Sequence, residues 1–244
     1  MVSSFQTCFI LYSELNAMPN SVQWLPLESN PEAITNFMHK IGVEKGVECV
    51  DVYGFEDDVL AFIPQPCYAV MLCFPVVDKV DKIMEPIYEK MKEKECVVPD
   101  GVFFMKQKIR NACGTFALIH SLANNQNKIN LGYGSLKQWL DKAVDLDVEE
   151  RSDSLAENSV LAEAHDNCAR GGDTDSNIVD HHFICYVNHG NKLLELDSSA
   201  PCPRICGLTS DATFLKDVGN TCKTLMNALE NQSFSALAIV RAFQ

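Results

Sequence analysis

Apolar positions recur at helical spacing in several stretches of the chain. In LESNPEAITNFMHKIG, residues 27–42, Asn30 is suited to the N-cap, Pro31 to the first turn and Gly42 to the stop. An apolar stripe bounded in this way predicts a helix. Residues 1–21 have no clean hydrophobic periodicity, so this helix is the first element that the pattern predicts.

Three further stretches have a helical period, namely 78–95, 135–146 and 211–229. Pro86 predicts a break or kink in the first of them, because proline lacks the backbone N–H. Ser135 is expected to cap the second. Residues 147–179 begin as a polar helix and end in a stretch rich in Gly, Asp, Asn and Ser, which predicts a surface loop.

Strand-like runs lie between these helices, at 49–55, 68–75 and 235–243. Residues 181–197 predict two strands around a turn at 188–191, because Asn and Gly favour tight hairpin turns. Residues 103–107 are also β-like, and a polar turn separates them from a helix near Cys113. Helices and strands mix without βαβ regularity, so the pattern favours an α+β fold. We expect a loosely ordered extension over 1–21 and one domain over 22–244.

Composition narrows the class of protein. The 244 residues are 47% apolar, and no apolar run approaches the roughly 18 residues of a membrane helix. The N-terminus has no secretory signal pattern. The 11 cysteines are scattered, so most are expected to be buried reduced thiols in the cytosol or nucleus. A net charge of −13 disfavours nucleic acid and anionic membranes and favours a basic partner, although solubility alone also explains it.

Four residues can form one catalytic site. Cys113 lies where a helix is expected to begin, and helix N-termini stabilise thiolates. Gln107 can donate its amide to an oxyanion beside the sulfur. His182 and Asp197 lie at the two ends of the predicted hairpin, which would come side by side. Asp197 could then orient the imidazole of His182, which would serve Cys113 as its base.

Other interpretations remain open at this level. A cysteine at a helix start is more often structural than catalytic. A structural zinc site is the rival chemistry, since six possible ligands cluster in the sequence: His181, His182, Cys185, His189, Cys202 and Cys206. The spacing C-x3-C lacks a matched second pair, and adjacent strand histidines point to opposite faces, so zinc is disfavoured. No metal or organic cofactor is expected.

Four segments resemble the short, single-domain ubiquitin carboxyl-terminal hydrolases. They are WLPLESNPE (24–32), VDVYGF (50–55), FFMKQKIRNACGTFALIHSLANN (103–125) and HHFICYVNHGNKLLELD (181–197). The resemblance runs from about residue 22 to 244. It implies a papain-like sandwich, with a central antiparallel sheet between helices and a knotted chain path. It also implies a nucleophile at Cys113, an oxyanion donor at Gln107, a base at His182 and an orienting carboxylate at Asp197.

The resemblance further implies a deubiquitinating thiol hydrolase. Such an enzyme removes small adducts and short or unfolded peptides from the C-terminal glycine of ubiquitin, behind a crossover segment at about 150–178. A monomer that binds ubiquitin is expected. The implied ubiquitin contacts are Pro26, Leu27, Glu28, Ser29, Asn30, Pro31, Ala169, Arg170, Gly171, Gly172, Asp173, Gln232, Ser233 and Phe234. The alternatives are a non-catalytic protein that stabilises free ubiquitin and a hydrolase for a related ubiquitin-like modifier.

Overall fold

One antiparallel sheet runs through the centre of the molecule. The computed structural model describes residues 22–76, 78–93, 96–171, 181–230 and 233–242. Within these residues the sheet has six strands in the order β1-β6-β2-β3-β4-β5, and every neighbouring pair is antiparallel. The strands are β1 (Val47–Asp51), β2 (Cys67–Pro75), β3 (His181–His189), β4 (Lys192–Leu196), β5 (Arg204–Leu208) and β6 (Ser235–Arg241).

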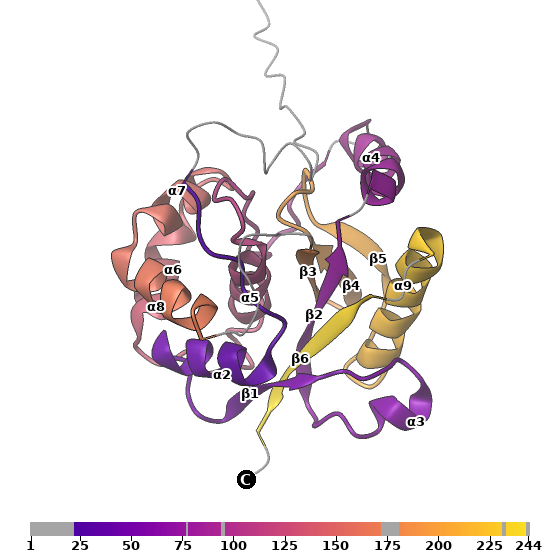
Figure 1. Ribbon diagram of the computed structural model, residues 1–244, viewed down its shortest axis with the longest axis horizontal. Helices are drawn as coiled ribbons and strands as arrows, with labels where there is room; N and C mark the ends of the chain where they lie inside the picture. Colours follow the sequence, from indigo (N-terminus) through magenta and orange to yellow (C-terminus); the bar gives the residue numbers. More distant parts are fainter. Residues whose placement is uncertain (1–21, 77, 94–95, 172–180, 231–232, 243–244) are drawn as a thin grey trace, which may run out of the picture.

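Helices lie on both sides of this sheet (Figure 1). One side carries α2 (Pro31–Lys40), α5 (Cys113–Ala123), α6 (Ser135–Ala143), α7 (Glu150–Ala156) and α8 (Ser159–Ala169). The other side carries α4 (Asp78–Glu93) and α9 (Phe214–Leu229), with the short α3 (Asp57–Leu60) nearby. The predicted α+β sandwich around an antiparallel sheet is therefore confirmed, while the knotted path stays a prediction.

Alternation along the strands gives the sheet two apolar faces. Met71 and Cys185 belong to the cluster that α5 completes, whereas Leu72 and Ile184 belong to the cluster on the side of α4 and α9. All residues of α5 are buried, so this helix is apolar around its whole circumference rather than along one stripe. A helix of this kind belongs inside a protein, and its first residue is Cys113.

The β3–β4 hairpin forms as predicted. His189 pairs with Lys192, which leaves Gly190 and Asn191 as the two loop residues, with φ of 57° and 61°. Positive φ at both positions is typical of a type I′ turn, whose twist matches that of the flanking strands. The register then places the residue after β4, Asp197, close to the start of β3.

The break that was one of the two expectations at Pro86 does not occur, whereas a kink there stays a prediction, and the cap expected at Ser135 is wrong. α4 continues through Pro86 to Glu93, because its inner face buries residues at four-residue spacing, such as Met84, and this burial offsets the lost backbone bond. Ser135 is the first helical residue and not the cap, which is Gly134. A Cβ at position 134 would come within 2.3 Å of the Cα of Gly42, so only glycine allows this close approach.

The β-like stretch 103–107 does not join the sheet. Its backbone N–H groups find other acceptors: that of Phe103 donates to Asn124 Oδ1 at 2.8 Å, and that of Met105 to His120 Nε2 at 2.9 Å. Side chains of α5 and of its C-terminal cap thus replace a neighbouring strand. The periodicity alone did not reveal this, because such partners are set by tertiary contacts. β5 and α3 were not among the elements that the sequence pattern predicted.

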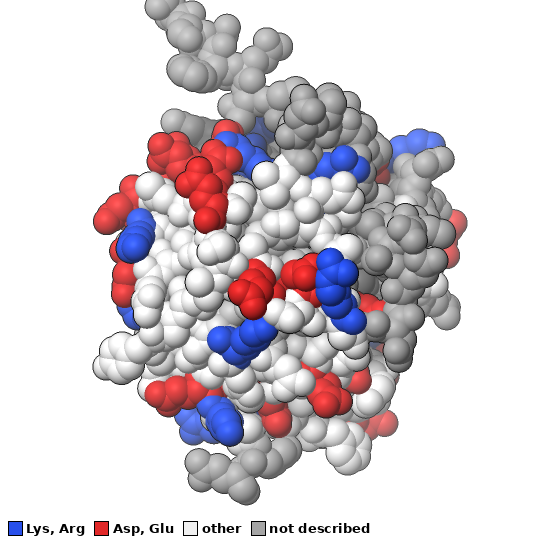
Figure 2. All heavy atoms as spheres, turned by 60° about the vertical axis from the view of Figure 1, so that its left-hand side comes forward, with Lys and Arg blue, Asp and Glu red and all other residues white. Residues whose placement is uncertain are grey.

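Charged side chains on the helical side of the molecule are mixed in sign. Figure 2 shows basic residues beside acidic ones over this face, rather than a single acidic patch. Lys108 Nζ, for example, lies 2.8 Å from Asp153 Oδ2. In the part of the chain that the structure describes, no helix has both the length and the apolar character needed to span a bilayer.

Candidate active site

Cys113 is the first residue of α5, as predicted. The N-cap is Ala112, whose methyl side chain cannot accept a hydrogen bond, so no side chain caps the first N–H groups of the helix. Asn111, just before it, is buried and has φ of 63°, a left-handed conformation that asparagine tolerates better than most residues. The helix start therefore presents uncapped N–H groups and the positive end of the dipole beside the Cys113 sulfur.

His182 lies between Asp197 and Cys113. Its Nε2 is 2.9 Å from Asp197 Oδ1, and both side chains are almost fully buried. Burial acts to lower the pKa of His182, but the charge and hydrogen bond of Asp197, together with a hydrogen bond to Cys113, outweigh it and raise that pKa well above its usual value. The geometry thus favours an imidazolium that is paired with the carboxylate on one side and with the sulfur on the other.

Asp197 is held at both carboxylate oxygens. Oδ1 faces His182 and also accepts from the backbone N–H of Ser199 at 2.8 Å. Oδ2 accepts from the hydroxyl of Tyr88, which comes from α4. A buried carboxylate with several donors keeps one orientation.

Gln107 is held by the residue that follows Asp197. Its backbone N–H donates to Ser198 O at 2.9 Å, and its Oε1 accepts from Ser198 Oγ at 2.9 Å. Its Nε2 donates to Ile109 O at 3.0 Å. Because a carbonyl can only accept, these contacts fix which end of the amide is the nitrogen and leave its second N–H available as a donor.

Ser198, Ser199 and Tyr88 were missed by sequence reasoning. The polar pair directly after a buried strand was a usable signal for the two serines, which contribute through the hydroxyl of Ser198 and the backbone N–H of Ser199. Tyr88 gave no local signal, since it lies 109 residues before Asp197. His181 is exposed while its neighbour His182 is buried, which agrees with the expectation that only one of the two faces the site.

Two of the predicted ubiquitin-contacting segments adjoin this site. Ser29 Oγ lies 2.6 Å from Ser235 Oγ, so the PLESNP segment (26–31) meets the start of β6. Phe234 stacks on Phe74 at 6.3 Å between ring centroids, and Phe74 meets His182 edge-on at 5.7 Å. Leu27, however, is buried, because it packs against Gly114. It supports the start of α5 rather than presenting a free surface.

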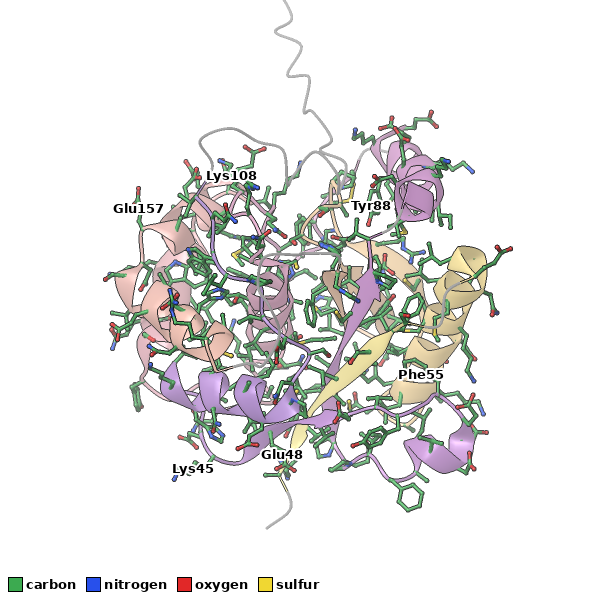
Figure 3. The ribbon with its side chains drawn as sticks, in the orientation of Figure 1. Lys45, Glu48, Phe55, Tyr88, Lys108 and Glu157 are labelled. Carbon is green, nitrogen blue, oxygen red and sulfur yellow. A yellow bond between two sulfur atoms is a disulfide. The ribbon has the colours of Figure 1, made fainter. Side chains whose placement is uncertain are left out.

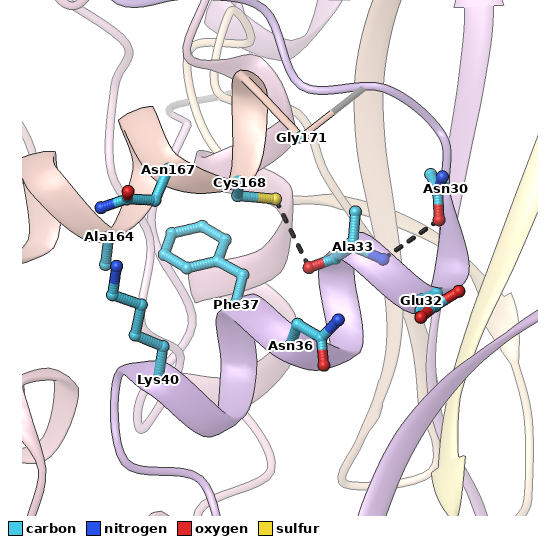
Figure 4. A pocket seen from close by; sticks show the side chains of 10 residues that line it. All are labelled: Asn30, Glu32, Ala33, Asn36, Phe37, Lys40, Ala164, Asn167, Cys168 and Gly171. Atoms are coloured by element: carbon cyan, nitrogen blue, oxygen red, sulfur yellow. Dashed lines mark hydrogen bonds between the residues drawn. The ribbon is translucent and has the colours of Figure 1, made fainter. Parts of the chain in front are cut away.

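The third segment meets PLESNP at a hollow of about 330 Å³ between α2 and α8. Figure 4 shows Asn30 and Gly171 on its rim, and Cys168 Sγ donates to Ala33 O at 3.4 Å. Arg170 lies nearby and pairs with Asp166 at 2.7 Å. The expected contacts Gly172, Asp173 and Gln232 lie outside the described residues.

The expected crossover at 150–178 divides into two parts. Residues 150–169 contain α7 and α8, which are packed helices with buried residues such as Leu155 and Leu161. Residues 172–178 lie outside the described residues, so a passage over the site stays a prediction. The helical part of this segment continues to Ala169, further than the sequence suggested.

Cys96 and Cys202 form a disulfide, although most cysteines were expected to be reduced. Eight other described cysteines are free. Cys202 follows the Asp197–Ser199 turn, so the bond ties that turn to the chain just after α4. Within the described residues no group of three or more His, Cys, Asp or Glu side chains is placed to hold a metal.

Removing this bond is expected to destabilise the fold. The two half-cystines are 106 residues apart, so the bond closes a long loop in the unfolded chain. Cys202→Ser should lower the free energy of unfolding by about 2–4 kcal/mol, because the unfolded chain gains conformational entropy when this loop is opened. Urea unfolding without reductant measures the change, with Cys206→Ser, a free thiol, as the matched control. An equal unfolding midpoint for wild type and Cys202→Ser would contradict the expectation.

The fold and the site together define a class. A sandwich of helices around an antiparallel sheet, with a cysteine at the start of a buried helix beside a His–Asp pair, is the arrangement of a cysteine hydrolase. The family model of ubiquitin carboxyl-terminal hydrolase, family 1, matches residues 24–227. The chain belongs to this family, and it is a cysteine hydrolase.

Relatives in sequence and structure agree. A ubiquitin carboxyl-terminal hydrolase of Drosophila melanogaster is 40% identical over 91% of this chain and 99% of its own length. Isozyme L1 of Homo sapiens is 35% identical over 91% of this chain and all of its own. Crystal structures of Trichinella spiralis UCH37 and of its catalytic domain, each bound to ubiquitin vinyl methyl ester, give TM-scores of 0.70. Their sequences are 22% and 23% identical to this one. Each match spans 90% of this chain, and it spans 82% of the UCH37 chain in the first structure and 96% of the catalytic domain in the second.

Proposed function

We propose that this hydrolase releases small adducts and short or unfolded peptides from the C-terminal glycine of ubiquitin, with Cys113 as nucleophile. The observation that carries the proposal is the position of His182, which interacts with Asp197 on one side and with Cys113 on the other. This arrangement places a nucleophilic sulfur beside an imidazole that can hold a proton. A nucleophile paired with an acid is what cleavage of an amide or thioester requires.

The reaction follows from these positions. The Cys113 sulfur attacks the carbonyl carbon of the terminal glycine, and the electrons of the C=O bond move onto its oxygen. The second N–H of Gln107 and the backbone N–H of Cys113 stabilise that oxyanion. The imidazolium of His182 gives its proton to the leaving amine or thiol, and a thioester remains. Water, deprotonated by His182, then attacks the thioester and frees the ubiquitin carboxylate and the Cys113 thiol.

The surroundings of the sulfur support a narrow substrate. Only 6% of Cys113 is exposed, so little space is open beside its sulfur. A chain with side chains would clash in such a space, whereas glycine residues fit. The Gly-Gly end of ubiquitin meets that condition. Binding of ubiquitin by related structures, as ubiquitin vinyl methyl ester, also supports this partner.

Covalent capture tests the proposal. Incubation with ubiquitin vinyl methyl ester should add one ubiquitin mass to the protein at Cys113, because the thiolate attacks the electrophile in place of the glycine carbonyl. Cys113→Ala should gain no mass. Cys168→Ala, which removes a free thiol that is more exposed than Cys113, should react like the wild type. Unchanged capture by Cys113→Ala, or binding of ubiquitin without any covalent product in wild type, would refute the proposal. The same probe made from a ubiquitin-like modifier reports which modifier is preferred.

A further inference from the structure

The second oxygen of the Asp197 carboxylate receives its donor from α4, on the opposite side of the sheet from the nucleophile's helix (Figure 1). Tyr88 is fully buried, and its hydroxyl donates to Asp197 Oδ2. Oδ1 meanwhile serves His182 and the N–H of Ser199. The two oxygens therefore have different partners: Oδ1 interacts with the imidazole, and Oδ2 with the tyrosine hydroxyl.

We propose that Tyr88 is a positioning residue of the reaction. It fixes the orientation of the Asp197 carboxylate and weakens the interaction of that carboxylate with the proton of His182. This inference rests on the proposed function, because it assigns a role within the Cys113–His182–Asp197 mechanism. Tyr88 does not touch the substrate. It acts on the imidazole only through Asp197.

The ring of Tyr88 is held firmly enough for this role. Val80, Met84 and Tyr88 follow one another at four-residue spacing along α4, and all three are buried in the cluster that also contains Phe74. Figure 3 labels Tyr88 where α4 approaches the end of the sheet. A phenol in an apolar cluster has little access to water, so its hydroxyl needs a protein acceptor. A charged acceptor gives the strongest such bond.

The expected effect on the proton has a definite sign. A donor to Oδ2 stabilises the ionised carboxylate and draws charge away from Oδ1. Without it the carboxylate is more basic and holds the imidazolium proton more strongly. The pKa of His182, already raised by Asp197 after the opposing effect of burial, then rises further. A weaker acid donates less readily to the leaving group, so kcat falls.

Other titratable groups near Asp197 do not produce the expected rise in the pKa of His182. Burial lowers the pKa of His120, on α5, to about 3. Burial raises the pKa of Cys185, on β3, to about 12. Both therefore stay neutral between those values. Cys113 itself interacts directly with His182, and its loss abolishes the reaction, so it is tested separately.

Tyr88→Phe tests the inference, because it removes one oxygen atom and keeps the ring. Hydrolysis of a fluorogenic ubiquitin C-terminal amide is followed from about pH 5 to 10.5. We expect kcat to fall about tenfold with KM unchanged within about twofold, the loss of one hydrogen bond to a charged group. The alkaline limb of kcat/KM, which reports deprotonation of the free enzyme's imidazolium, should move to higher pH. Met84→Leu, on the same face of α4, perturbs packing alone and should leave the limb in place.

Each possible result either supports or overturns the positioning role of Tyr88. A Tyr88→Phe enzyme with wild-type kcat, or with a lowered kcat but an unmoved alkaline limb, overturns the positioning role. If the variant unfolds, covalent capture by ubiquitin vinyl methyl ester counts the folded sites, and kcat and the limb are taken per captured site. Cys113→Ala is measured alongside: turnover by that variant would overturn the proposed function, whereas an inactive Cys113→Ala with an unaltered Tyr88→Phe overturns only the role of Tyr88.

Discussion

Cys113→Ala should lower the turnover of a fluorogenic ubiquitin C-terminal amide by about ten-thousand-fold or more, with ubiquitin binding retained. In the proposed mechanism the sulfur forms the thioester, and its neighbours Ala112 and Gly114 carry no group that could replace it. Loss of a nucleophile typically leaves only what binding and oxyanion stabilisation supply. Alanine fits at the helix start, so the fold should persist.

Steady-state kinetics and ubiquitin titration of the same protein separate the two effects. Cys73→Ala is the matched control, because Cys73 is a buried free thiol in the same apolar cluster. It should keep most of the wild-type turnover. Turnover by Cys113→Ala above a hundredth of the wild-type rate would exclude Cys113 as the nucleophile, and a similar loss in Cys73→Ala would point to packing instead.

Gln107→Ala should lower kcat about 100- to 1000-fold while KM changes little. The amide N–H acts on charge that develops on the carbonyl oxygen only in the transition state, which is the signature of an oxyanion donor. The amide is buried and oriented before substrate arrives, through Ser198 Oγ on one end and Ile109 O on the other. A donor that needs no rearrangement contributes its full effect.

Ser198→Ala makes the comparison sharper. It removes the hydroxyl that holds Oε1 but keeps the backbone carbonyl that binds the N–H of Gln107. Its loss of kcat should therefore be smaller, about tenfold, the equivalent of one hydrogen bond. Rates for the two variants and the wild type at one pH decide the matter. A Gln107→Ala enzyme that loses less than Ser198→Ala would show that the amide is structural and not an oxyanion donor.

Local patterns predicted much of the fold. The helix at 31–40 formed with Asn30 as its cap, since Asn30 Oδ1 accepts from the N–H of Ala33 at 3.0 Å. The hairpin formed because its turn residues favour positive φ. The start of α5 at Cys113 followed from the polar turn before an apolar run. The same reasoning failed for 103–107, where Asn124 and His120 take the place of a strand, and for Pro86, where burial keeps the helix intact.

The sequence by itself determined the start of α5 at Cys113 and the hairpin that brings His182 and Asp197 together, because both depend on neighbours within a few residues or on one turn. Only the tertiary structure decided what holds these groups in place. Tyr88 reaches Asp197 across 109 residues, and Ser198 reaches Gln107 across 91. Such contacts leave no period in the chain, since they form only when separate elements pack together at the same buried end of the central strands.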